Sequence, residues 1–170
     1  PFYKFGEIMF LQKIDEKSWV QYIKKRFSKT GKQVSAETAR LIAQCVECHP
    51  YYVQQLAQQS WLRTKDSCNN DIVLEAFDNL SLRLSLLFQS LTDSFSITQV
   101  NFLKAVLLDA SKLSSKDTLL EYQLGTSANI LRIKEALINR EIIDIFEGKI
   151  ELLDPVYKYW LKKYYFKIRM

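Results

Sequence analysis

The only histidine of the chain, His49, stands directly before Pro50, which opens a strongly apolar segment. A proline at the first position of a helix needs no backbone partner, and its ring holds φ near a helical value. The pattern therefore predicts a helix that begins at Pro50. The N–H groups of a first helical turn lie at the positive end of the helix dipole, so this helix start is suited to a phosphate or another anion. In the simpler alternative, the His49 side chain only caps backbone donors.

Two cysteines close to this histidine admit two further kinds of chemistry. Cys45, Cys48 and His49 have the spacing of a covalent haem attachment motif, and together with Cys68 they supply four candidate zinc ligands. We favour neither, because no export signal is visible and Cys68 has no partner at a zinc-site spacing. One histidine without a recognisable carboxylate pair also gives no catalytic triad. We therefore expect no metal ligands and no catalytic residues in this chain.

The composition predicts a globular, mainly helical protein. Hydrophobic residues make up 48% of the 170 residues, and only four are glycine and three proline. The formal net charge of +5 permits contact with a polyanion but does not require it. No apolar run approaches the roughly 18 residues of a membrane span, so we expect a cytoplasmic protein with no membrane partner. Because the first residue is Pro1 and not methionine, we expect the chain to be part of a longer protein.

The first half of the sequence predicts a small helical bundle. Residues 1–14 alternate short apolar groups and are expected to form an extended lead-in. Helical apolar spacing then recurs four times, with Asp15 and Ser35 as candidate N-caps of the first two helices. The four expected helices span residues 15–31, 35–46, 50–61 and 71–91. The run Thr92-Asp93-Ser94 breaks the pattern, so we expect one domain over residues 15–92 and a second over 93–170.

The second half predicts three helices followed by a hairpin and a last helix. Ser96 and Gln99 have capping-box spacing, and Asp154-Pro155 is a typical helix start. The expected helices span residues 96–107, 115–124, 127–141 and 154–165, and the expected strands span 142–146 and 149–153. Three helices followed by a hairpin are the parts of a winged helix-turn-helix, whose third helix often enters the DNA major groove.

The third of these helices and the hairpin supply the candidate partner contacts. The residues expected to face DNA or a protein partner are Asn129, Arg132, Lys134, Arg140 and Lys149. Arginine and lysine neutralise phosphates, and asparagine and arginine also pair with base edges. However, several carboxylates in the same segments would repel DNA: Glu135, Glu141, Asp144, Glu147 and Glu151. DNA and protein partners therefore both remain open. For the aromatic and lysine-rich tail after residue 156 we favour packing over binding of single-stranded nucleic acid.

The order and spacing of several motifs resemble a known family. Phe5-Gly6-Glu7-Ile8, the stretch from Trp19 to His49-Pro50-Tyr51-Tyr52, and the run from Ile150 to Leu161 are similar to the carboxy-terminal part of prokaryotic STAND-type AAA+ ATPases, predicted ATPases related to the archaeal ATPase family. The resemblance implies a four-helix lid followed by a winged helix. It also implies that His49 and Pro50 face the bound nucleotide, ATP or ADP with Mg²⁺. For the basic sensor residue of such a lid it offers two candidates, Arg40 and Arg63.

The chain departs from the family at the motifs that perform hydrolysis. It has no glycine-rich loop ending in Lys-Ser/Thr and no apolar strand ending in paired acidic residues. We therefore expect no enzyme activity and no cofactor in this fragment itself. Its expected partner is an upstream P-loop domain of the same protein, whose nucleotide state the lid senses. The alternatives are a stand-alone winged-helix DNA-binding regulator and a protein-interaction adaptor.

Overall fold

The computed structural model describes residues 14–110 and 112–169, and these are mainly helical with one small antiparallel strand pair. The chain divides into two compact units. Unit 1 runs up to Phe77 and unit 2 begins at Asp78. The expected extended lead-in lies outside the described residues, apart from Ile14.

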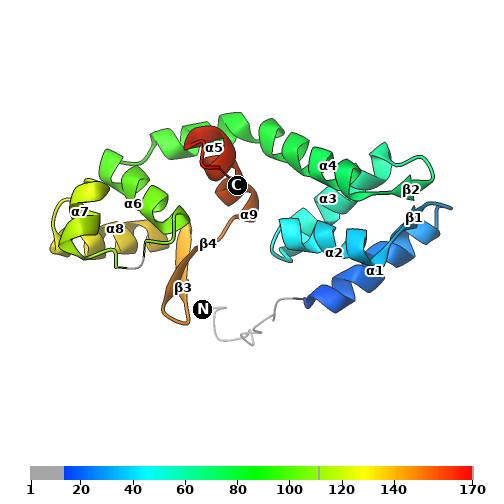
Figure 1. Ribbon diagram of the computed structural model, residues 1–170, viewed down its shortest axis with the longest axis horizontal. Coiled ribbons are helices and arrows are strands. Elements are labelled where there is room, and N and C mark those ends of the chain that lie inside the picture. The colour runs from blue at the N-terminus through cyan, green and yellow to red at the C-terminus, as the bar shows by residue number, and fades with distance from the viewer. Residues whose placement is uncertain (1–13, 111, 170) are drawn as a thin grey trace, which may run out of the picture. The chain divides into compact units, whose positions relative to one another are not determined.

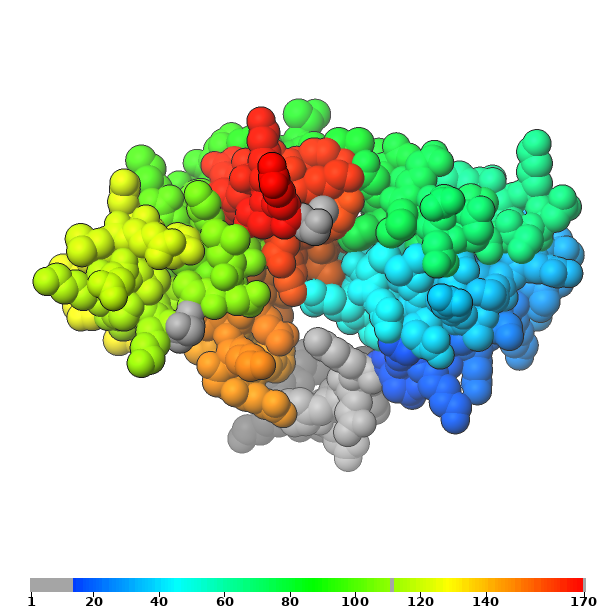
Figure 2. All heavy atoms as spheres, viewed as in Figure 1, coloured from blue at the N-terminus to red at the C-terminus, as the bar shows by residue number. Residues whose placement is uncertain are grey.

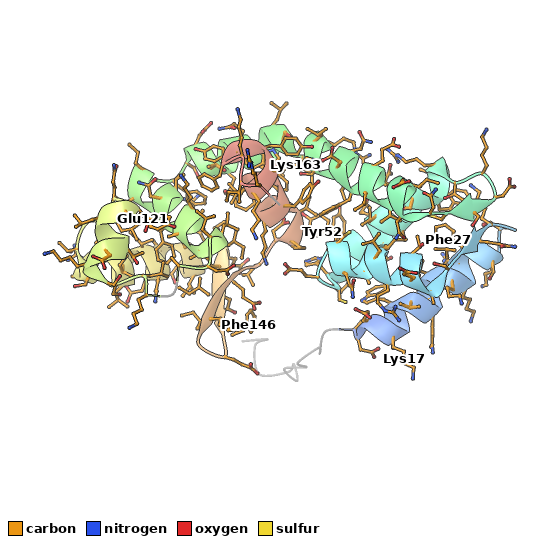
Figure 3. All side chains as sticks on the ribbon, in the orientation of Figure 1. Lys17, Phe27, Tyr52, Glu121, Phe146 and Lys163 are labelled. Carbon is orange, nitrogen blue, oxygen red and sulfur yellow. The ribbon has the colours of Figure 1, made fainter. Side chains whose placement is uncertain are left out.

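Unit 1 contains the predicted bundle helices (Figure 1). They are α1 (Glu16–Ser28), α2 (Ala36–Cys45), α3 (Pro50–Arg63) and the first part of α4 (Asn70–Arg83). The predicted caps of the first two helices are confirmed, since Asp15 accepts from the Ser18 N–H at 2.8 Å and Ser35 from the Thr38 N–H at 2.9 Å. Phe27 lies among these helices (Figure 3), and the buried core of this unit also includes Trp19, Ile23, Ile42, Val53, Leu56 and Val73.

A short parallel strand pair in unit 1 was not predicted. Strand β1 (Gln33–Val34) pairs with β2 (Ser67–Cys68), and Gln33 lies opposite Ser67. The sequence pattern predicts only a polar break between the third and fourth helices. Strands of two residues are too short for the alternating pattern by which sequence reveals a strand.

The predicted helix over residues 71–91 is two helices in the structure. α4 ends at Arg83 and α5 (Ser85–Asp93) begins directly after Leu84, whose φ of −91° and ψ of 0° leave the helical region. No glycine or proline marks this break. The expected domain boundary at Thr92-Asp93-Ser94 also differs from the observed division after Phe77. Residues 78–92 group with unit 2 because their side chains bind and pack against the carboxy-terminal helix of that unit.

Unit 2 has the predicted order of three helices, a hairpin and a last helix (Figure 1). Its further elements are α6 (Ile97–Leu107), α7 (Lys116–Glu121), α8 (Ser127–Asn139), β3 (Ile143–Phe146), β4 (Lys149–Leu152), α9 (Pro155–Trp160) and a π-helical turn, η2 (Leu161–Tyr165). The capping box of Ser96 and Gln99 is present, and Asp154 caps α9. The strands β3 and β4 are antiparallel, and α8 packs against both α6 and β3. The hairpin, orange in Figure 2, protrudes from the helices of this unit.

The last helix is held against α5. Tyr157 and Trp160 pack on Phe88, with ring centroids 5.2 and 5.8 Å from that of Phe88. The buried hydroxyl groups of Thr92 and Tyr157 share a hydrogen bond of 2.8 Å, and the Trp160 indole donates to Ser85 Oγ at 2.9 Å. These tail aromatics therefore pack within unit 2, which is the role that the sequence favours over binding of single-stranded nucleic acid.

Candidate functional site

The first candidate site is the start of α3 in unit 1. The two residues before it, Glu47 and Cys48, both have left-handed backbone conformations, with φ of 49° and 56°. Such values are uncommon for residues other than glycine and often occur where a loop must aim a side chain. They turn the chain sharply after α2, so that His49 becomes the N-cap residue of α3 and Pro50 its first helical residue. The predicted helix start is thus confirmed.

The side chain of His49 does not cap the helix, so the simpler alternative is wrong in that respect. It makes no cap hydrogen bond, and its buried Nδ1 has no hydrogen-bond partner among the described residues. The ring instead lies beside that of Tyr52, with 5.0 Å between centroids. A buried ring nitrogen without a partner is uncommon, because its desolvation is not compensated. Because this nitrogen is also closed to solvent, a ligand can reach it only after the ring turns outward.

This helix start fits an anionic group. A helix of this length carries a partial positive charge at its first turn, and here no side-chain oxygen of the N-cap residue occupies that turn. Pro50 has no N–H to satisfy. No acidic residue lies in the first turn of α3 to repel an anion. The residues around His49 therefore suit a phosphate, although a phosphate alone does not specify a nucleotide.

The two candidate sensor arginines are engaged within unit 1. Arg40 Nε lies 2.9 Å from Glu16 Oε1. Arg63 lies 3.7 Å from Glu75 and also donates to the carbonyl and side-chain oxygens of Gln59. Each guanidinium thus has a carboxylate partner in this structure.

The cysteines do not gather with His49 into a metal site. Within residues 14–110 and 112–169, no three His, Cys, Asp or Glu side chains are arranged to hold a metal ion. Burial raises the pKa of the Cys45 thiol to about 11, which disfavours the thiolate that a metal or a nucleophilic reaction needs.

The second candidate site is the surface of α8 and the hairpin. Two of its five predicted contact residues hold unit 2 together. Asn129 donates to the Leu124 carbonyl oxygen at 2.9 Å, and Arg140 donates to Ser94 Oγ at 2.6 Å. The Arg140 guanidinium also lies 4.3 Å from the centre of the Phe95 ring. These roles were missed because helical periodicity shows that a residue is exposed, but not which loop passes beside it.

The remaining predicted contacts are available on this surface, together with two apolar side chains. One of them, Leu131, is expected from the helical pattern to face inward, and that expectation is wrong. Arg132 and Lys149 are exposed and Lys134 is half-buried. Leu131 on α8 is 61% exposed, and Phe146 at the tip of the hairpin is 41% exposed (Figure 3). Exposed apolar residues beside a few charges are more typical of a protein-binding surface than of a DNA-binding one.

A cluster missed from sequence joins α4 to the last helical turn within unit 2. Asp78 Oδ1 accepts hydrogen bonds from Lys163 Nζ at 2.6 Å, from the Tyr159 hydroxyl at 3.1 Å and from the Tyr164 hydroxyl. Desolvation acts to raise the pKa of Asp78, but the three hydrogen bonds outweigh it and hold the pKa below its usual value. No signal in the sequence pairs these residues, since Asp78 and Lys163 are 85 residues apart.

Comparison with known proteins gives a structural relationship. No protein-family model and no curated protein matches the chain. Among solved structures, the Walker-type ATPase PABY2304 of Pyrococcus abyssi is similar, with a TM-score of 0.68 over 88% of this chain at 15% sequence identity. The chain shares its fold with part of that ATPase. It spans only 42% of the length of that protein, so the similarity concerns the fold alone.

None of the helices in the described part of the chain is both long and apolar enough to cross a membrane.

Proposed function

We propose that this chain is the regulatory carboxy-terminal part of a P-loop ATPase of the AAA+ STAND type. In this proposal unit 1 is a lid that responds to bound nucleotide, and unit 2 is a winged helix that contacts a partner. The observation that carries the proposal is the shared fold with a Walker-type ATPase over 88% of the chain. The order of three helices and a hairpin in unit 2 supports it as well.

We infer that His49 and the first turn of α3 face the nucleotide. The P-loop domain would bind ATP or ADP with Mg²⁺, since this chain lacks both motifs that do so. The α3 helix start would then add its dipole and hydrogen bonds from its first-turn N–H groups to a phosphate oxygen. Support comes from the first turn of α3, which no N-cap side chain occupies.

The test is a His49→Asn substitution in the ATPase that contains this chain. Asparagine is a good N-cap, so it should preserve or raise the stability of α3 by up to about 1 kcal/mol. It removes the imidazole and competes for the first-turn N–H groups. We therefore expect roughly tenfold weaker ATP retention with unchanged folding, measured by equilibrium dialysis and thermal unfolding. Lys17→Ala, an exposed position on α1, is the matched control.

Unchanged ATP affinity in His49→Asn would reject the nucleotide-facing role. The isolated 170-residue chain should bind ATP negligibly and hydrolyse none, because it has no phosphate-binding loop. Clear turnover by this chain alone would overturn the proposal as a whole.

For unit 2 we place contact with a protein first, because the exposed Leu131 and Phe146 lie on the predicted recognition surface. DNA binding is the second candidate, supported by Arg132, Lys134 and Lys149. Titration of the chain with a short random-sequence duplex separates them. We expect weak binding that falls steeply between about 50 and 200 mM salt, with a slope reduced by about two units in Arg132→Ala/Lys134→Ala. Tight binding that selects one sequence would instead favour a DNA-binding regulator.

A further inference from the structure

A groove between α1 and α3 in unit 1 belongs to neither candidate site. Its volume is about 530 Å³, and ten residues of the two helices and the turn after α1 line it. Tyr22, Arg26 and Lys29 follow one another at helical spacing along one wall, and Gln54, Gln58 and Trp61 do so along the other. The groove thus runs between two helices and is not a hole in the core.

The floor of the groove is apolar. Ile23 and Phe27 underlie it from α1 and are almost fully buried. The apolar surface that a ligand can reach belongs to Tyr22, which is 40% exposed, and to Ala57 and Trp61, which are half-buried. On α3 the small side chain of Ala57 lies between the two glutamines and leaves room for a side chain from outside. An apolar floor with space above it suits leucine-sized side chains of a ligand.

The charge on the rim has one sign. Arg26 and Lys29 are exposed, and neither forms an ion pair with another described residue. Lys32 adds a third cation beside the groove, with its Nζ 4.2 Å from the centre of the Trp61 ring. Among the residues that the structure describes, no carboxylate lines the groove. A ligand that brings its own carboxylates to the α1 side would neutralise these cations.

The backbone of both walls is already hydrogen-bonded within α1 and α3, so the groove offers no free strand edge to an extended peptide. An occupant must satisfy its own backbone groups, as a helix does. A stacked nucleic-acid base fits less well. Lys32 lies over one face of Trp61, and the Arg26 guanidinium lies 5.7 Å from the centre of the Tyr22 ring, so cations occupy positions where a base would stack.

From these features we propose that the α1–α3 groove binds an acidic amphipathic helix of a partner protein. The apolar side chains of that helix pack on Tyr22, Ala57 and Trp61. Its carboxylates pair with Arg26 and Lys29. This is a binding function separate from the nucleotide and DNA roles, and it does not depend on them.

Selection from a phage-displayed library of random peptides of about 16 residues, roughly four helical turns, tests the proposal on the 170-residue chain. The expected winners have net negative charge and apolar residues at helical spacing. Measured by fluorescence anisotropy, Arg26→Glu should weaken their binding about tenfold. Ala57→Leu, which fills the floor without changing charge, should weaken it comparably. Lys24→Glu is the matched control, since Lys24 is exposed on the same helix but does not line the groove, and its effect should stay within about twofold.

Circular dichroism and thermal unfolding of each variant separate loss of binding from loss of fold. The proposal fails if no peptide is enriched, or if enriched peptides lack acidic and apolar periodicity. It also fails if Lys24→Glu weakens binding as much as Arg26→Glu does. Displacement of bound peptide by a short oligo-dT at equal concentration would show that the groove serves nucleic acid instead.

Discussion

The hydrogen bonds to Asp78 give the sharpest prediction for stability. One carboxylate oxygen accepts from Lys163, Tyr159 and Tyr164, and these three residues belong to the last helical turns of the chain. Asp78→Asn keeps the size of the side chain and an acceptor oxygen but removes the charge. The three donors then bond to a neutral acceptor, and charge-assisted bonds are roughly twice as strong as neutral ones.

The exposure of the Asp78–Lys163 ion pair sets the expected loss of stability. A hydrogen bond to a charged group contributes about 1.5–3 kcal/mol when buried, and a surface ion pair about 0–1 kcal/mol. The side chains of Lys163 and Asp78 are 36% and 32% exposed, which places them between these cases. We expect Asp78→Asn to destabilise unit 2 by about 1–2 kcal/mol. When Asp78→Asn and Lys163→Met are combined, the loss of stability should be smaller than the sum of the two single losses, with a coupling energy of about 1 kcal/mol.

The effect should depend on pH in a defined direction. Hydrogen bonding, which outweighs desolvation, holds the folded-state pKa of Asp78 below the usual 3.8. The carboxylate therefore contributes stability above pH 3.8, and the contribution is lost as the pH falls through the folded-state value. For Lys163, the hydrogen bond to Asp78 is the main cause that raises its pKa above 10.5. Its contribution is present below pH 10.5 and is lost as the pH rises through the higher folded-state value.

Urea unfolding followed by circular dichroism measures these differences. The difference in free energy of unfolding between wild type and Asp78→Asn should be constant from about pH 5 to pH 9. It should shrink below the usual pKa of aspartate. Amide hydrogen exchange should rise in residues 161–165 and not in unit 1. A gap below about 0.5 kcal/mol, or one of equal size at about pH 3 and pH 7, would refute the role assigned to Asp78.

Two further predictions concern single residues of unit 1. Gly31 has φ of +76°, and an added Cβ would have nothing within 4 Å. Gly31→Ala should therefore lower the free energy of unfolding by about 1 kcal/mol through backbone strain alone, and Gly31→Asn should lower it less, because asparagine tolerates the left-handed conformation better. Thermal unfolding checks this, and equal costs for both variants would contradict the backbone explanation. With Cys48 and Cys68 replaced by serine, alkylation of Cys45 should be slow near pH 8 and accelerate toward its pKa of about 11. Rapid alkylation near pH 8 would show that desolvation does not raise the pKa of this thiol.

Much of the local structure could be predicted because helix starts carry short-range chemical signals. Asp15, Ser35, Ser96 and Asp154 each accept a hydrogen bond from an N–H two or three residues later. A cap of this kind needs only its neighbours in sequence, so composition and spacing suffice to find it. The hairpin between β3 and β4 was found for the same reason, since Gly148 occupies a left-handed turn position between two apolar runs.

The candidate sites were less predictable because they depend on contacts between distant segments. Arg140 and Ser94 are separated by 46 residues, and Asp78 and Lys163 by 85. Nothing at either position alone shows that the other lies within hydrogen-bonding distance. The α3 start was found from Pro50, but the unpartnered Nδ1 of His49 depends on the left-handed conformations of Glu47 and Cys48. Neither residue type marks such a conformation.

Helix α4 shows why the division of the chain could not be found from its pattern. Along its whole length the apolar residues keep helical spacing, from Val73 through Phe77 to Leu80. Periodicity records that a face is buried, but not which segment covers it. The polar contacts supply that information. Before Phe77, α4 contributes to unit 1, where Asn70 accepts from Thr38 at 2.8 Å; after it, Asp78 bonds to the last turns of unit 2. A domain boundary sought only in loops would therefore be placed too late, because the change of partner takes place within a continuous helix.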